Sequence, residues 1–185
     1  KGGQRIENDL QTNGTMLDED WARFLKQHRF LVGLSIDGPR EIHDHYRITK
    51  RAEPTFDKVF AAAKMLHKHG VRFNTLTCVH RYNASKPLDV YRFLRREVGS
   101  TYIQFIPIVE IKGFENIAPG AWDTANLPIV GDPRCHPDHP ESVVTPWSVA
   151  ADEYGYFLCK IWDEWQSRDV GKVLGLPEDM ITALS

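Results

Sequence analysis

Short apolar segments recur along the chain, and their length and composition predict buried strands. Phe30 to Ile36, Val71 to Val79 and Thr101 to Pro107 are rich in branched residues and too short for typical helices. A fourth, shorter strand is expected at Arg5 to Leu10, just before the polar loop Gln11 to Gly14, whose Asn-Gly pair is a turn signal.

Between and after these segments, apolar residues recur with the period of an amphipathic helix. Asp18 and Thr55 are good N-caps, Pro87 suits a first helical turn, and a longer helix is expected from about Ala150 to Arg168. The stripes expected to face the core are Trp21, Phe24 and Leu25; Phe56, Val59, Phe60, Ala63 and Leu66; Leu88, Tyr91, Leu94 and Val98; and Tyr154, Phe157, Leu158, Ile161 and Trp165.

Strands and helices alternate without an obvious hairpin, and this order defines the expected fold class. Gly70 and Gly99 are placed to end helices in left-handed turns, after which the next strand begins. Such alternation is typical of an α/β fold with a parallel sheet and crossover helices. A chain of 185 residues suits one domain, so we expect residues 1–185 to fold together.

Two stretches depart from this rhythm. Residues 108–146 form a long proline-rich segment with little periodicity, and ordered loops of that length are usually functional. The tail 171–185 follows no clear pattern, although Leu176 to Asp179 resembles the start of a short helix.

Composition and charge exclude some classes of function. A formal net charge of -2 argues against a general nucleic-acid-binding surface. The basic cluster of Arg92 with Arg95 and Arg96 falls on an expected helix, where a solvated face is the usual explanation. The sequence has no secretory signal and no run that could span a bilayer, which favours a cytoplasmic protein without a membrane partner.

The three cysteines, Cys78, Cys135 and Cys159, are far apart and odd in number. This usage fits a reduced cytosolic chain better than a disulfide framework, and it matches no common metal spacing. Cys78 lies in an expected strand and Cys159 on an expected helix, so both are predicted to be inert core thiols.

Polar residues follow the strand Phe30 to Ile36 at the point where it ends. Ser35 and Asp37 stand at this end, before the turn signal Gly38-Pro39, and Arg47 follows in a polar segment. The carboxyl ends of parallel strands are where α/β proteins bind ligands. The alternative is that Ser35, Asp37 and Arg47 only brace the turn.

Two histidine-containing segments are weaker candidates. The run Cys135-His136-Pro137-Asp138-His139 offers groups that suit zinc or nickel, but no pair has the helical HExxH spacing and its prolines restrict the loop. His43 and His45 flank Asp44, yet alternate residues of an extended loop point apart. We therefore expect polar surface residues and no physiological metal site in both segments.

Four stretches of the sequence read LQTNGTMLDEDW, FLVGLSIDGPREIHDHYR, FNTLTCVHRYNA and YIQFIPIVE. Together they resemble the radical S-adenosylmethionine (SAM) enzymes, and most of all the anaerobic sulfatase-maturating enzymes. The resemblance implies a partial (β/α) barrel of the TIM type, a [4Fe-4S] cluster and SAM as cofactors. It also implies the oxidation of a Cys or Ser of a sulfatase to formylglycine by a 5′-deoxyadenosyl radical.

The resemblance also assigns residues to SAM. Ser35 and Arg47 match SAM contacts of the family in the SxDGP…HxxxR pattern, and Val109 matches a contact at the end of QFIPIV. A guanidinium suits a carboxylate, and a serine hydroxyl can bond the ribose or the amino acid end of SAM. The remaining candidates, which are expected to line the same cavity, are Gln11, Thr12, Asn13 and Gln104.

Several motifs of that family are missing. The sequence has neither the CxxxCxxC loop that holds the cluster nor the Gly-Gly-Glu motif. We therefore expect an internal piece of the barrel, with about four of its strands and no catalytic residue, that does not cleave SAM by itself. The parent would act on a sulfatase polypeptide, and exposed strand edges predict a homo-oligomer. Another radical SAM peptide-modifying maturase and a non-catalytic binding or regulatory module remain alternatives.

Overall fold

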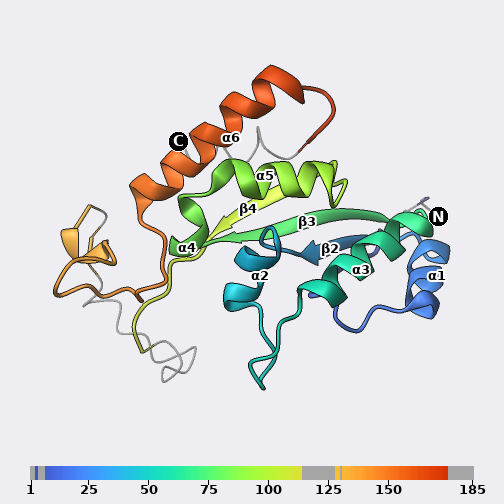
Figure 1. The fold of residues 1–185 in the computed structure, drawn as a ribbon, viewed down its shortest axis with the longest axis horizontal. Helices are drawn as coiled ribbons and strands as arrows, with labels where there is room; N and C mark the ends of the chain where they lie inside the picture. Colours follow the sequence, from blue (N-terminus) through green and yellow to red (C-terminus); the bar gives the residue numbers. More distant parts are fainter. Residues whose placement is uncertain (1–2, 4–6, 114–127, 130, 175–185) are drawn as a thin grey trace.

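The computed structural model describes residues 3, 7–113, 128–129 and 131–174, and it contains a parallel four-stranded sheet. The strands lie side by side in sequence order: β1 (Asp9–Thr12), β2 (Leu31–Ser35), β3 (Arg72–Val79) and β4 (Ile103–Pro107). Every neighbouring pair is parallel, so all carboxyl ends lie at one edge of the sheet (Figure 1). The expected α/β class and the number of strands are confirmed.

Helices connect the strands as crossovers. They are α1 (Glu19–Gln27), α2 (Arg40–Tyr46), α3 (Phe56–Lys68), α4 (Arg81–Ala84), α5 (Pro87–Arg96) and α6 (Ala151–Arg168), with a 3₁₀ turn η3 at Pro133–Cys135. In Figure 1, α6 lies along the outer side of α5. Gly70 and Gly99 end α3 and the α5 segment with φ of +62° and +69°, as their positions in the sequence predict.

The two faces of the sheet differ in what covers them. Val32, Leu34 and Ile36 alternate along β2 and its end, and all three are fully buried beneath the helices. The alternate residues of β2, Leu31, Gly33 and Ser35, point to the other face, where Leu31 is exposed and Ser35 is partly buried. The sheet therefore has one packed face and one open face, as expected for a partial barrel.

The open face carries polar side chains from neighbouring strands. Gln11 pairs in register with Gly33, and Leu76 pairs with Gln104, so Gln11 and Gln104 both point to this side. Asn74 on β3 also points here, and its Nδ2 donates to Gln104 Oε1 at 3.2 Å.

Two expectations about the first strand and helix are wrong in detail. β1 covers Asp9–Thr12, so Gln11 and Thr12 belong to the strand and not to the loop after it. The helix capped by Asp18 buries Ala22 and Leu25, whereas Trp21 and Phe24 are 48% and 44% exposed. The Asp18 carboxylate accepts from the Trp21 N–H at 2.8 Å, as an N-cap should.

The sequence pattern did not predict two of the helices. α2 occupies the polar segment after β2, and α4 lies between the strand Val71 to Val79 and the helix that begins at Pro87, where no helix was expected. Both are short and carry few apolar residues, so neither gives a periodic signal. Each lies in the connection that follows a strand, beside the carboxyl ends of the strands where a ligand would bind.

One prediction about a core residue is wrong, and the solvated face predicted for the arginine cluster is also used for ion pairs. Cys159 is exposed on α6 and is not a core thiol. The basic cluster on α5 is partly paired, because Arg92 binds Glu164 through two hydrogen bonds of 2.9 and 3.0 Å. Arg95 contacts Asp169 at 3.2 Å, so this face of α5 binds the α6 segment as well as solvent.

Described residues of the long segment after β4 form backbone contacts near the strand ends. The Val149 N–H donates to Ile108 O at 2.9 Å, and Ile111 forms an antiparallel bridge with Val144. After α6 the chain returns to the outer edge of β4, where Leu174 forms a parallel bridge with Tyr102. The helix start expected at Leu176 lies outside the described residues. Among the described helices, none has the length and apolar character needed to cross a bilayer.

Candidate functional site

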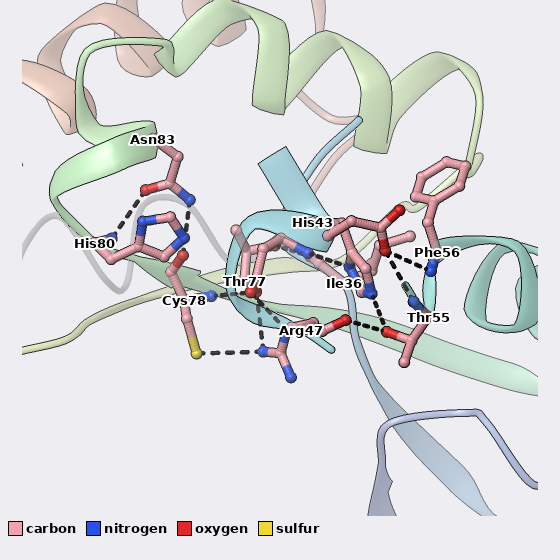
Figure 2. Close-up of polar contacts among 11 residues, drawn as sticks. Ile36, His43, Arg47, Thr55, Phe56, Thr77, Cys78, His80 and Asn83 are labelled. Carbon is pink, nitrogen blue, oxygen red and sulfur yellow. Dashed lines mark hydrogen bonds and ion pairs between the residues drawn. The ribbon is translucent and has the colours of Figure 1, made fainter. Parts of the chain in front are cut away.

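An ion pair lies at the carboxyl end of β2, where the sequence placed its polar cluster. Arg47 Nε donates to Asp37 Oδ2 at 2.5 Å, and Arg47 Nη2 donates to Asp37 Oδ1 at 2.9 Å (Figure 2). The Asp37 side chain is 3% exposed and that of Arg47 is 24% exposed. The geometry is the two-pronged arrangement that guanidinium and carboxylate groups favour.

β3 completes the surroundings of the Asp37 carboxylate. The Cys78 N–H donates to Asp37 Oδ1 at 2.9 Å, and Arg47 Nη2 lies 3.3 Å from Cys78 Sγ. Burial raises the pKa of the Cys78 thiol, and the negative charge of Asp37 raises it further. Cys78 is therefore a neutral thiol at the site, and it is not activated as a nucleophile.

His43 on α2 fixes the loop that carries this ion pair. It is fully buried, and its Nδ1 accepts from the Asp37 N–H at 3.3 Å. Its Nε2 lies 3.1 Å from Thr55 Oγ1, whose proton goes to Arg47 O at 2.5 Å, so Nε2 carries the imidazole proton. Burial lowers the pKa of His43 to about 4, which keeps it neutral. The expectation that this histidine is a surface residue is wrong.

Asp44 fixes the start of α3. Its Oδ1 accepts from the backbone N–H groups of Thr55 and Phe56 at 2.9 and 2.8 Å, so it caps the helix from outside. Thr55 occupies the N-cap position that the sequence predicts, but its hydroxyl donates to Arg47 and does not cap the helix. The segment from α2 to α3 is therefore one hydrogen-bonded unit around Arg47.

A cavity of about 440 Å³ opens beside the ion pair. Strand ends, α2 and the segment after β4 supply its lining, which consists of Asp37, Tyr46, Arg47, Cys78, His80, Ile108 and Trp147. The size suits a small organic ligand, and the mixture of apolar walls with a few polar groups is typical of such sites. Sequence reasoning did not single out Tyr46, His80 or Trp147, because only the fold brings them together.

The other residues expected to contact SAM do not line this cavity, and Gln104 lines a separate one with Arg72 and Thr101 near the amino ends of the strands. Ser35 ends β2 on the open face, and Gln11 and Gln104 lie on the same face. Val109 follows β4 directly after the cavity residue Ile108 and is 60% exposed. Their assignment to SAM stays a prediction.

Thr12 and Asn13 are engaged in a turn. Thr12 Oγ1 accepts from the Gly14 N–H at 3.1 Å, and Asn13 Oδ1 accepts from the Thr15 N–H at 3.2 Å. By the alternation of β1, Thr12 points to the helix-covered face, opposite to Gln11. A contact of either residue with SAM stays a prediction.

The run Cys135 to His139 is built into turns. His136 Nδ1 accepts from the Asp138 N–H at 3.2 Å, and His139 Nδ1 accepts from the Glu141 N–H at 3.1 Å. In the part of the chain that is described, no group of three or more His, Cys, Asp or Glu side chains could hold a metal ion. A [4Fe-4S] cluster therefore does not fit the described residues, whereas the cavity beside Arg47 can accept an organic ligand.

A comparison with the models of known families gives a match over half of the chain. The model of the radical SAM superfamily matches residues 2–94. The chain therefore belongs to the radical SAM superfamily.

Curated relatives of the chain include both serine-type and cysteine-type enzymes. It is 41% identical over 171 residues to a serine-type anaerobic sulfatase-maturating enzyme of Bacteroides thetaiotaomicron, covering 92% of this chain and 38% of the relative. It is 36% identical over 157 residues to a cysteine-type enzyme of Clostridium novyi, covering 84% of this chain and 34% of that one. The chain thus spans little more than a third of the length of these relatives.

The chain is also similar to solved structures. The protein anSMEcpe with bound AdoMet (SAM) and the Cp18Cys peptide superimposes with a TM-score of 0.69 at 32% identity. The match covers 94% of this chain and 41% of that protein. The described fold is therefore similar to part of a radical SAM enzyme whose structure contains both SAM and a peptide.

Proposed function

We propose that this chain is the SAM-binding part of an anaerobic sulfatase-maturating enzyme. The main support is the position of Arg47, which stands beside a ligand-sized cavity at the strand ends in a chain of the radical SAM superfamily. Further support is the similarity of this chain to both serine-type and cysteine-type maturating enzymes.

Arg47 is suited to the carboxylate of SAM because part of its guanidinium remains available. Asp37 takes Nε and one hydrogen of Nη2, and Nη1 makes no hydrogen bond to any described residue. Asp37 therefore orients the group while Nη1 stays free to donate to a ligand. Ser35, whose hydroxyl has no described partner, is assigned to the ribose or amino acid end of SAM.

The chemistry requires more than this segment. SAM bound at a [4Fe-4S] cluster supplies an adenosyl radical, and the described residues do not hold such a cluster. The proposal assigns to this chain the binding and orientation of SAM, with the cluster ligands outside its sequence. The oxidation of a sulfatase Cys or Ser to formylglycine is then a property of the whole enzyme.

A chimeric enzyme tests this proposal. Residues 9–171 would replace the matching segment of the Bacteroides thetaiotaomicron relative, to which the chain is 41% identical. We expect the purified, reconstituted chimera to form formylglycine in a sulfatase peptide, measured by mass spectrometry under anaerobic conditions. Retained SAM cleavage without peptide oxidation would instead favour a maturase with another peptide target.

Arg47→Ala in the chimera tests the site itself. We expect it to weaken SAM binding at least tenfold because the carboxylate loses its charged partner. Arg40→Ala is the matched control, since Arg40 is an exposed arginine paired with Asp57 on the outside of α2 and α3. Equal SAM affinity in both variants would contradict the assignment of Arg47.

A further inference from the structure

His80 is a buried polar side chain without a partner in the wall of the cavity. It is 3% exposed, and neither ring nitrogen makes a hydrogen bond within the described residues. It is the only buried side chain of the described residues with this property. Buried polar groups in native proteins are nearly always paired, so an exception in a cavity wall points to a partner outside the described residues.

The backbone around His80 is firmly held. Its N–H donates to Asn83 Oδ1 at 2.9 Å, and Asn83 Nδ2 donates to Cys78 O at 2.9 Å (Figure 2). The His80 carbonyl also accepts from the backbone N–H groups of Asn83 and Ala84 in α4. Tyr46 stands edge-on to the imidazole, with ring centroids 4.6 Å apart. The imidazole is therefore pre-oriented, which lowers the entropy that a bound partner would cost.

The form of the imidazole limits the partner. Burial lowers the pKa of His80 to about 4, so the ring is neutral at physiological pH. A neutral imidazole has one donor and one acceptor nitrogen, and it suits a neutral group with a hydrogen-bonding edge. Tyr46, Trp147 and Ile108 add flat or apolar surfaces to the same cavity. A planar heteroaromatic ring satisfies both requirements.

We propose that His80 recognises the hydrogen-bonding edge of the adenine of SAM. The inference rests on the proposed binding of SAM, in which Arg47 on the wall of the same cavity takes the carboxylate. Adenine has the required flat faces and an edge of donor and acceptor nitrogens. His80 is thereby a residue that selects the base, separate from the contacts assigned to Arg47 and Ser35.

Two variants and two ligands test this assignment. His80→Phe keeps a ring of similar shape but removes both nitrogens. His28→Phe is the matched control, because His28 is exposed at the end of α1, contacts Phe24 with ring centroids 4.4 Å apart and does not line the cavity. Calorimetric titration of the reconstituted chimera described above with SAM, and with S-inosylhomocysteine against S-adenosylhomocysteine, measures the contribution of the base.

We expect His80→Phe to weaken SAM binding about tenfold or more and to reduce the preference for the adenine ligand over the hypoxanthine ligand. The same variant should leave the ligand-free chain as stable as, or more stable than, the wild type, since two unpaired buried nitrogens are removed. A residue that only supports the fold would lower stability and would not change the choice of base.

The outcomes separate the two proposals. If the wild type binds SAM and His80→Phe binds it equally well, the role of His80 is wrong and SAM binding stands. If His80→Phe weakens both ligands alike and destabilises the chain, the role of His80 is also wrong. If the reconstituted wild-type chimera binds no SAM at millimolar concentration, the proposed function fails, and the role of His80 fails with it.

Discussion

Asp37 orients Arg47 through two hydrogen bonds while it accepts a third from the Cys78 backbone. The carboxylate is buried, so its charge is tolerated only because three donors surround it. The same contacts prevent Arg47 from adopting its many other rotamers. The ion pair thus contributes to local order and prepares a guanidinium for a carboxylate ligand.

Asp37→Asn should disrupt this arrangement with little change of shape. We expect a loss of about 2–4 kcal/mol in the free energy of unfolding, because Arg47 keeps its charge without a charged partner. Urea unfolding followed by circular dichroism measures the change. Asp57→Asn is the control, since Asp57 pairs with Arg40 at the exposed surface and should cost less than about 1 kcal/mol. Equal losses in the two variants would contradict the special role of the buried pair.

His43 gives the fold a dependence on pH. Its pKa is about 4 in the folded chain because of burial, against about 6.5 in an unfolded chain. The unfolded state therefore binds the proton first, so the contribution of His43 to stability is present above pH 6.5 and is lost as the pH falls toward 4. Asp37, Arg47 and Asp44 are the charged groups near the ring.

We expect His43 to account for a loss of about 1 kcal/mol near pH 6 and about 3 kcal/mol near pH 4. Unfolding by urea at a series of pH values measures this slope in the wild type and in His43→Gln. The variant should be less stable at pH 7.5 and should show a shallower slope below pH 6.5. An identical slope in the variant would show that His43 does not control acid unfolding.

At the scale of elements, long amphipathic segments and their ends could be predicted from the sequence. Gly70, Pro87 and Gly99 act where their chemistry indicates, since φ or a missing N–H decides the local backbone. α2 could not be predicted in this way. Its seven residues include a buried histidine whose two partners lie outside the helix, so burial there depends on tertiary contacts and not on periodicity.

The site also contains residues that could be predicted from the sequence and residues that could not. Ser35, Asp37 and Arg47 lie at the strand end where the alternation of strands and helices places ligands. The contact between Arg47 and Cys78 could not be predicted, because the two residues are 31 positions apart. Trp147 lies directly after the proline-rich segment 108–146 and reaches the cavity through backbone pairing that no local pattern indicates.

The end of α1 contains a residue in an unfavourable conformation. Arg29 has φ of +57°, just after the C-cap His28, where a glycine is usual. Arg29→Gly should therefore stabilise the chain by about 0.5–1 kcal/mol, because a side chain in the left-handed region is strained. Thermal or urea unfolding measures the change. His28→Gly is the control: its φ is −92°, so glycine should destabilise there, and a gain at both positions would contradict the explanation.

At the scale of the molecule, the site lies at the carboxyl ends of the parallel strands, and one face of the sheet is open. Helices bury the other face, while Leu31 and Ile106 on the open face are 41% and 43% exposed. The outer edge of β1 has no strand partner in the described residues, and the outer edge of β4 is paired only at its start by Leu174. Unpaired backbone groups on a strand edge favour association with another chain.

Homo-oligomerisation through the edge of β1 is the expected consequence for these 185 residues. Sedimentation velocity should show a mass that rises with concentration, because edge pairing joins two chains by mass action. Gln11→Lys places a charge in the exposed edge strand and should shift the equilibrium toward the monomer. Ala61→Lys adds the same charge to an exposed position of α3 and should have little effect. A compact monomer at every concentration, or equal effects of the two substitutions, would show that β1 does not mediate association.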